Sequence, residues 1–169
     1  SLSGVIPTSI GNLIELKSIY LHDNKIEGHI PTSIGNLTKL ELIFLYSNEL
    51  SGEIPSSLGN LNKVTNLLLL SNELEGSIPA SIGNMSMLQY LNVAENRLSG
   101  SIPSQLGNLS QMHTLRIDYN ELTGQLPSSL CSLSNLVIFY AQMNKLTGDI
   151  PLCLLTNGPS QFRISHNYY

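Results

Sequence analysis

The chain has 169 residues, of which 41% are hydrophobic and 12% charged, and its formal net charge is −4. The charged fraction is about half that of an average soluble domain, and Ser, Thr, Asn and Gly supply the polarity instead. The negative charge and the lack of a Lys/Arg cluster argue against a nucleic-acid partner. No apolar run approaches the roughly 20 residues that a membrane-spanning helix needs.

One pattern with a period of 24 residues organises the chain. The segment Leu67–Pro79, LLLLSNELEGSIP, contains an Asn, a Gly and a Pro that each recur at this spacing. The recurring asparagines are Asn24, Asn48, Asn72, Asn96, Asn120 and Asn144; the glycines run from Gly4 to Gly148 and the prolines from Pro7 to Pro151. Such self-similarity indicates a repeat array, in which each unit buries its apolar side against its neighbours.

Taken in order, residues 1–12 form the back half of a repeat, and full repeats begin at residues 13, 37, 61, 85, 109 and 133. Their common form is LxxLxxLxLxxNxLxGxIPxxLGN. The sixth repeat departs from it at Leu152–Thr156, and Phe162-x-Ile164-x-x-Asn167 predicts a further strand that arrives one residue early. We treat residues 1–169 as a single array whose irregular last repeat covers about 157–169. Since both ends fall in mid-repeat, we expect a fragment that lacks its caps.

Each part of the repeat has a physical reading. The x-Leu-x-Leu-x segment alternates as a strand with one buried face must, and strands that return in the same direction stack as a parallel sheet. The Asn that follows can bind backbone groups, and its recurrence predicts an internal ladder that satisfies buried amides. The Gly permits a positive φ, and the Pro fixes φ and blocks a long helix. The remaining segment is long enough for a turn or a 3₁₀ helix only.

This pattern resembles the plant-type leucine-rich repeat family, and the match covers nearly the whole chain. The resemblance implies an α/β-type right-handed solenoid with a parallel sheet on its concave side. It also implies short extra strands near the Leu-x-Gly-x-Ile-Pro segments and 3₁₀ turns on the convex side. Family members of this type are mostly receptor ectodomains, polygalacturonase-inhibitor-like wall proteins and a few ice-binding proteins, which bind outside the cell without catalysis. The expectation is therefore a non-catalytic scaffold, extracellular or at the cell surface, that holds a protein or peptide on its concave face.

Two other functions stay open. The chain could be a structural module that packs within a larger extracellular assembly. It could also bind ice or polysaccharide through the hydroxyl groups of the convex turns, although Ala80 and Gln105 interrupt that array. The hydroxyl residues concerned include Thr8, Ser9, Thr32, Ser33, Ser56 and Ser57.

The outward positions of the strands form columns, because the repeat frame is fixed. Several are apolar where a one-sided sheet should be polar, and such a patch usually marks a contact surface. The alternatives are that the sheet tolerates them or that another part of the full protein covers them. The candidate partner-binding residues are Tyr20, Leu42, Phe44, Tyr46, Leu68, Leu70, Asn92, Arg116, Asp118 and Tyr140.

No catalytic constellation is apparent, so we expect no enzyme, no cofactor and no metal. The histidines are dispersed along the chain, and His29, the one that shares a repeat with another (His22), sits beside the Gly-x-Ile-Pro turn rather than on the sheet. Each Gly serves a repeat turn rather than a phosphate-binding loop. Arg116 and Asp118 share one strand face, where a solvated ion pair is the commoner arrangement. No Cys/His spacing suggests zinc.

Three glycosylation sequons occur, at Asn36, Asn84 and Asn108. They share one repeat column with Asn12 and Asn60, which lack the hydroxyl residue, so the column could instead serve to cap the convex turn.

The two cysteines, Cys131 and Cys153, lie in neighbouring repeats but two residues out of register. A disulfide needs Cα atoms within about 7 Å, and an undistorted coil would place these two near that limit. A disulfide, buried thiols, and pairing with a cysteine of an absent cap all stay open.

Overall fold

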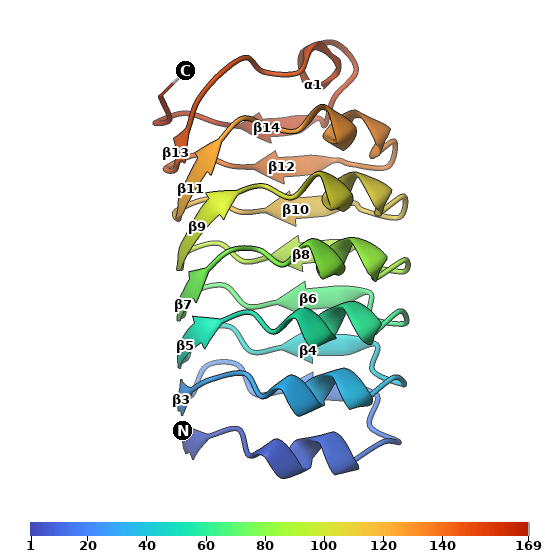
Figure 1. The fold of residues 1–169 in the computed structure, drawn as a ribbon, viewed down its shortest axis with the longest axis vertical. Coiled ribbons are helices and arrows are strands. Elements are labelled where there is room, and N and C mark those ends of the chain that lie inside the picture. Colours follow the sequence, from blue (N-terminus) through green and yellow to red (C-terminus); the bar gives the residue numbers. More distant parts are fainter. Residues whose placement is uncertain (169) are drawn as a thin grey trace.

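The computed structural model describes residues 1–168, which form one right-handed solenoid (Figure 1). Each coil passes through a strand of one sheet, a strand of a second sheet and a short 3₁₀ helix. The main sheet has seven parallel strands: β2 (Ser18–Tyr20), β4 (Leu42–Phe44), β6 (Asn66–Leu68), β8 (Tyr90–Asn92), β10 (Thr114–Arg116), β12 (Ile138–Tyr140) and β14 (Gln161–Arg163).

The second sheet also has seven parallel strands, and it contains the Leu-x-Gly segments. Its members are β1 (Ser3–Val5), β3 (Lys25–Gly28), β5 (Glu49–Glu53), β7 (Glu73–Gly76), β9 (Arg97–Ser101), β11 (Glu121–Gly124) and β13 (Lys145–Leu146). The glycine of each segment has a positive φ, between 73° and 91°, as the repeat pattern predicts. Both the parallel main sheet and the short extra strands expected from the family resemblance are confirmed.

In the main sheet, residues that are one repeat apart in the sequence pair with each other on neighbouring strands. In the main sheet, Ser18 pairs with Leu42 and Leu42 with Asn66, a shift of one full repeat at each step. At the last step Phe139 pairs with Phe162, so β14 arrives one residue early, as its sequence predicts. Residues in one column of the sequence therefore lie side by side on the sheet.

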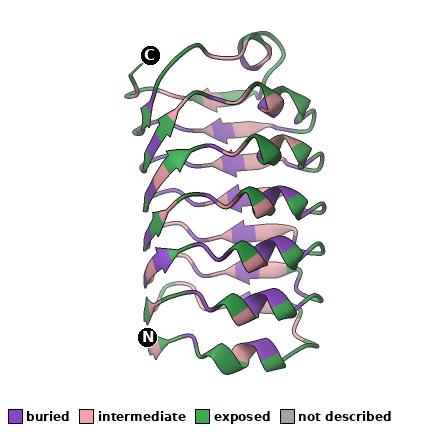
Figure 2. Ribbon diagram, in the orientation of Figure 1, coloured by how far each residue is buried: buried purple, intermediate pink, exposed green. Residues whose placement is uncertain are grey.

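Buried residues occur in both sheets and in the 3₁₀ helices along the whole array (Figure 2), and their apolar side chains form one core cluster. The apolar positions of the repeat point into it: Leu37, Leu40, Ile43 and Leu45 are at most 1% exposed. Each such side chain contributes roughly 1.5–3 kcal/mol by leaving water. Because every coil lies against the next, no coil has a complete core of its own.

An asparagine ladder runs beside the main sheet and joins neighbouring coils. The Oδ1 atom of Asn72 accepts the N–H of Leu50, in the preceding coil, at 3.1 Å. Its Nδ2 donates to the carbonyls of Leu45 in that coil and of Leu69 in its own coil, both at 3.1 Å. Asn120 and Asn144 are buried, and the other ladder members are half-buried. The corresponding contacts are made by Asn24, Asn48, Asn96, Asn120, Asn144 and Asn167.

The residue before each ladder asparagine adopts a left-handed conformation, with φ between 54° and 57°. These residues, which include Ser71, Glu95 and Tyr119, are not glycines, so the conformation costs energy. Hydrogen bonds between coils offset that cost: the N–H of Ser71 donates to the carbonyl of Ala94 at 3.1 Å. The turn directs the asparagine side chain toward the preceding coil.

The face opposite the main sheet consists of 3₁₀ helices, which the sequence also predicts. They are η1 (Thr8–Asn12), η2 (Thr32–Asn36), η3 (Ser56–Asn60), η4 (Ala80–Asn84), η5 (Ser104–Asn108) and η6 (Ser128–Ser132). Gly35 lies so close to the next coil that an added Cβ would come within 2.5 Å of the Ser57 carbonyl oxygen. The Ser57 hydroxyl in turn donates to the carbonyl of Thr32 at 2.7 Å. This face is therefore held by its own contacts between coils.

The two cysteines occupy the positions of this close contact between Gly35 and Ser57, four repeats further along the chain. Cys131 stands in the column of Gly35 and Cys153 in that of Ser57, and each pair is separated by 22 residues. Cys131 and Cys153 form a disulfide, with Cα atoms 5.7 Å apart. It connects η6 to the short helix α1 (Leu152–Thr156), which replaces a 3₁₀ helix where the sixth repeat loses its pattern.

Replacing an asparagine of the ladder should destabilise the protein more than replacing an exposed asparagine on the 3₁₀ face. Replacing Asn72 with Ala should lower the free energy of unfolding by roughly 1–3 kcal/mol, because buried backbone groups of two coils lose their partners. Chemical denaturation of the variant measures the loss. Asn60→Ala is the matched control, since Asn60 is exposed at the end of η3. Equal losses in the two variants would contradict the role of the ladder.

Candidate functional site

The exposed face of the main sheet carries most of the residues singled out from the sequence. One column follows the solenoid axis through consecutive strands and ends on a residue of β14. Its members, in order, are Tyr20, Phe44, Leu68, Asn92, Arg116, Tyr140 and Arg163. We call this row the central column. The side chains at its N-terminal end are aromatic, a side-chain amide stands in its middle, and the side chains at its C-terminal end include two cations.

Aromatic rings gather at the N-terminal end of this face. Tyr20 meets Phe44 edge to face with ring centroids 5.2 Å apart, and His22 stacks on Tyr46 at 4.6 Å. Tyr20 is 55% exposed and the others are half-buried against one another. We define the apolar patch as these four rings together with Leu42, Leu68 and Leu70. Leu68 and Leu70 continue the two columns of the rings on β6 and the segment after it, and Leu42 lies in the neighbouring outward column on β4. Edge-to-face rings are worth about 0.5–1.5 kcal/mol a pair beyond their burial, so the patch is preorganised.

His22 belongs to the apolar patch, although its residue type gave no sequence signal for an apolar contact. Its Nδ1 atom is shielded and has no hydrogen-bond partner among the described residues. The sequence indicated this place for His22 only through its spacing of 24 residues from Tyr46, which shares its column with Leu70.

Side-chain amides occupy the middle of the face. The Oδ1 atom of Asn92 accepts the N–H of Ala94 at 3.1 Å, and the Oδ1 atom of Asn66 accepts the Thr65 hydroxyl at 2.8 Å. Both asparagines therefore direct their acceptor toward their own coil. Their NH₂ groups donate no hydrogen bond within the described part of the chain.

At Asp118 the structure differs from the sequence expectation of a solvated pair on the outer face. The Asp118 carboxylate is 0% exposed and accepts two hydrogen bonds from Arg116, from Nη2 at 2.8 Å and from Nε at 3.2 Å. Gln142, in the next coil, donates a third at 3.2 Å. The Arg116 and Gln142 side chains therefore occupy the Asp118 carboxylate, and Asp118 itself offers no exposed surface to a partner. The hydrogen bonds to Asp118 raise the pKa of the Arg116 guanidinium above its usual value.

Two guanidinium groups flank Tyr140. The central carbon of Arg116 lies 5.3 Å from the ring centroid and that of Arg163 lies 4.7 Å from it. The Tyr140 hydroxyl donates to Oε1 of Gln161 at 2.6 Å, which fixes the ring. Arg163 was missed because it reaches the central column only through the early arrival of β14. Arg163 forms no ion pair with any residue that the structure describes.

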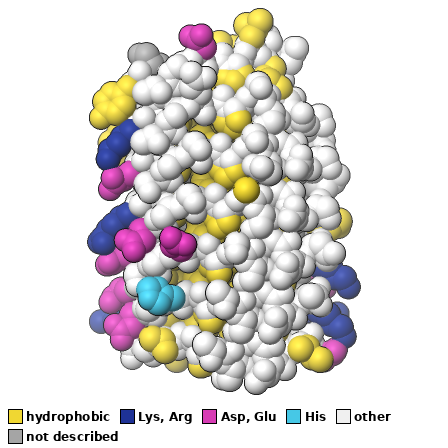
Figure 3. All heavy atoms as spheres, in the orientation of Figure 1, with side chains coloured by type: hydrophobic (Ala, Val, Ile, Leu, Met, Phe, Trp, Pro, Cys, Tyr) yellow, Lys and Arg dark blue, Asp and Glu magenta, His cyan; other side chains and the backbone are white. Residues whose placement is uncertain are grey.

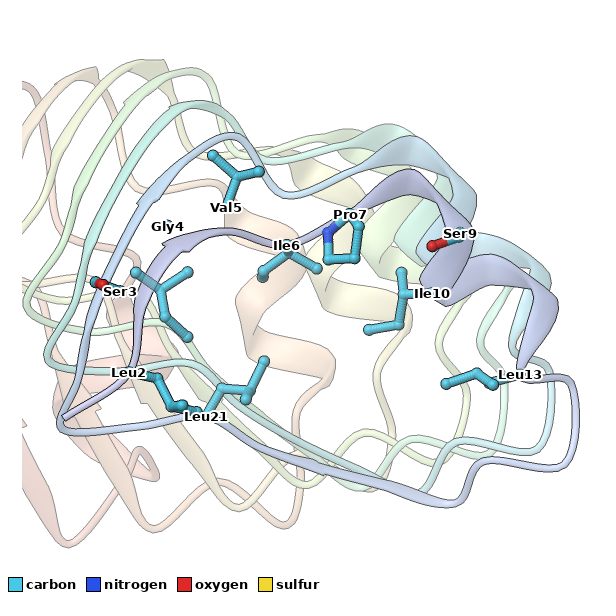
Figure 4. A pocket seen from close by; sticks show the side chains of 11 residues that line it. Leu2, Ser3, Gly4, Val5, Ile6, Pro7, Ser9, Ile10, Leu13 and Leu21 are labelled. Carbon is cyan, nitrogen blue, oxygen red and sulfur yellow. The ribbon is translucent and has the colours of Figure 1, made fainter.

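Within residues 1–168 no three His, Cys, Asp or Glu side chains converge as metal ligands would. The same residues contain no helix that is long and apolar enough to cross a membrane. A hollow of about 360 Å³ opens at the first coil, where Leu2, Ile6, Ile10 and Leu21 point into it (Figure 4). No titratable side chain lines it, so it is an uncovered part of the hydrophobic core.

The three sequon asparagines lie together on the opposite side of the molecule. Asn36, Asn84 and Asn108 are the last residues of η2, η4 and η5, and all three are exposed. Asn12 and Asn60 hold the same place in η1 and η3 and are equally exposed.

The burial of Asp118 predicts an unequal response to loss of either partner. Arg116→Gln should destabilise by about 3–5 kcal/mol, because it strands a buried carboxylate. Asp118→Asn should cost less, since the Arg116 side chain is 30% exposed and can turn to water. Urea denaturation of both single variants and the double variant checks this. A double variant less stable than Arg116→Gln would contradict the account.

This architecture is similar to that of known leucine-rich repeat proteins. A family model described as a leucine-rich repeat region matches residues 3–149. A search of curated proteins gives no match. Among solved structures, the plant peptide hormone receptor RGFR1 in complex with RGF2 is 36% identical, with a TM-score of 0.94 over 99% of this chain and 27% of that chain. A TDR receptor is 32% identical, with a TM-score of 0.94 over 98% and 29% of the two chains.

A plant ice-binding protein is 30% identical, with a TM-score of 0.88 over 99% of this chain and 54% of that chain. The chain thus spans less than a third of either receptor and about half of the ice-binding protein. The family match and the period, the asparagine ladder and the two parallel sheets agree: the chain belongs to the leucine-rich repeat family, in its plant-type subclass.

Proposed function

We propose that the main sheet binds a peptide or an extended protein segment, and that the chain does this without catalysis. The observation that carries the proposal is the apolar patch. Four aromatic rings lie against one another, and three leucines occupy neighbouring outward positions of the same strands and of the next coil. Aromatic side chains held in place in this way are typical anchors of binding surfaces.

The comparisons support this proposal. The RGFR1 structure is that of a peptide hormone receptor in a complex, and its repeats superpose on nearly the whole of this chain. The disulfide between Cys131 and Cys153 favours an oxidising compartment, so we place the protein outside the cell or at its surface. The candidate contact residues of the central column lie on the same face as the patch.

Ice or polysaccharide binding is a second candidate, which the ice-binding neighbour favours. In the view of Figure 3 the 3₁₀ face is largely uncharged, and most of the charged side chains visible there lie toward its two sides. However, the hydroxyls of Ser33, Ser57 and Ser81 donate to carbonyls of the preceding coils, which removes one of the two hydroxyl columns from a ligand. Ala80 interrupts the other column. We therefore rank this function below peptide binding.

The proposal predicts that charges on the apolar patch abolish binding. Peptides selected from a random display library against the wild-type chain should bind the double variant Phe44→Asp, Leu68→Asp at least about a hundredfold more weakly, because two anchors become desolvated charges. Fluorescence anisotropy with the selected peptides measures the affinities. Circular dichroism should show an unchanged fold, since both side chains lie outside the core.

The matched control is Ser56→Asp, Ser104→Asp, which adds the same charge to exposed positions on the 3₁₀ face. This control should bind the peptides like the wild type. Equal affinity for the patch variant and the wild type would refute the proposal. A change of oligomeric state in the patch variant, without loss of peptide binding, would instead favour the role of an assembly module.

A secretory location predicts glycans on the sequon column. Secretion from a eukaryotic host should yield glycopeptides at Asn36, Asn84 and Asn108, because all three are exposed in the folded chain. Asn12 and Asn60 share their environment but lack the sequon, so they should stay unmodified. Mass spectrometry after glycosidase treatment in heavy-oxygen water resolves the sites. Secreted chains unmodified at all three would contradict the prediction.

A further inference from the structure

The central column has two different ends, and we infer that its partner is an extended peptide with an apolar side chain and an acidic side chain about seven residues apart. This inference rests on the proposed function, which it deepens by naming the chemistry and spacing of the ligand. Four features carry it: the charges of the sheet face, the position of the Tyr140 ring, the free donors between the two ends, and the strand spacing.

The charges of the face leave one exposed cation. The outward columns that run through Leu42, Phe44 and Tyr46 contain a single carboxylate, that of Asp118, which is 0% exposed and already bound to Arg116. Arg163 is exposed and forms no ion pair within the described residues. Within these columns the exposed charge at this end is therefore positive, on a chain whose net charge is −4; outside them, the carboxylate of Glu95 lies on a turn near Arg116. A partner carboxylate is the complementary group.

Tyr140 shapes how a carboxylate can reach this cation. The ring stands between Arg116 and Arg163 and is fixed by the hydrogen bond from its hydroxyl to Gln161. A peptide backbone above the central column must pass over the ring and stay away from the sheet surface. An Asp or Glu side chain can descend beside the ring to Arg163, whereas a terminal carboxylate stays at the level of the backbone. The geometry thus favours an acidic side chain.

Donors for a peptide backbone lie between the two ends. The NH₂ groups of Asn66 and Asn92 are not used within the described part of the chain, since the oxygen of each side chain faces its own coil. Both residues are half-buried in outward columns of β6 and β8. Amide donors of this kind bind carbonyl groups whatever the peptide sequence. The middle of the column can therefore hold a backbone without selecting side chains.

The spacing follows from the register. Phe44 and Arg163 are five strand steps apart in the central column. At about 4.8 Å per step the separation is about 24 Å, and an extended chain covers it with about seven residues at 3.3 Å each. A ligand much shorter than this cannot contact both ends.

Selection from a displayed library of random peptides about twelve residues long tests this inference, since that length exceeds the span. The library is selected against the wild type, Arg163→Glu and Lys63→Glu. Lys63 is exposed and lies on the turn before β6, so its variant carries the same charge change away from the face. Wild-type selections should enrich an acidic residue about seven positions from an apolar one. Selections against Arg163→Glu should enrich Lys or Arg at that position, and the Lys63→Glu pool should match the wild type.

Synthetic peptides from the wild-type pool should bind Arg163→Glu about tenfold more weakly at low salt, and the difference should shrink at high salt. Peptides that need Phe44 and Leu68 but show no acidic preference would overturn the inference and leave the proposed function intact. An acidic effect that appears only with a free C-terminus, and is lost on amidation, would also overturn it. Peptides that bind independently of Phe44 and Leu68 would refute both.

Discussion

The structure depends on one hydrogen-bonded contact that is repeated in every coil: the side-chain amide of an asparagine bound to the backbone of the coil before it. Where the chain leaves the main sheet, its N–H and carbonyl groups would otherwise point into a dry interior. The amide of Asn72 binds one N–H and three carbonyls at 3.1–3.2 Å, so a single short side chain satisfies groups of two coils. A buried amide left without partners costs about 1–3 kcal/mol, and this cost recurs at each coil.

This contact also fixes the surface. Because the asparagine reaches a defined backbone atom in the preceding coil, the coils cannot slip relative to one another. Main-sheet register is then one repeat per strand, and outward residues form straight columns. The repeat constrains inward residues and leaves the outward positions free to vary. On this frame the outward residues of the central column change from Phe44 to Asn92 to Arg163 without any change in the fold.

Most of the fold could be predicted from the period, because apolar, Asn, Gly and Pro positions each have a separate physical reason. The left-handed residues could not, since Ser71, Glu95 and Tyr119 share no residue type and are held in that conformation by the coils around them. The reason for the disulfide appears only in the structure: Cys131 and Cys153 occupy the repeat positions at which a Gly and a Ser of neighbouring coils lie in close contact. The burial of Asp118 depends on the conformation of the Arg116 side chain, which binds its carboxylate. The place of Arg163 in the central column depends on a one-residue shift of β14. The sequence thus predicts columns well and side-chain partnerships poorly.

Hydrogen exchange at single amides tests the central claim most directly. In the native protein the N–H of Leu74 donates to Asn96, and that of Leu122 donates to Asn144. The account predicts that Asn96→Ala accelerates exchange of the Leu74 amide in two-dimensional NMR spectra and leaves the Leu122 amide as slow as in the wild type. Unchanged exchange at Leu74, or an equal acceleration at both amides, would show that the asparagine does not hold its own pair of coils.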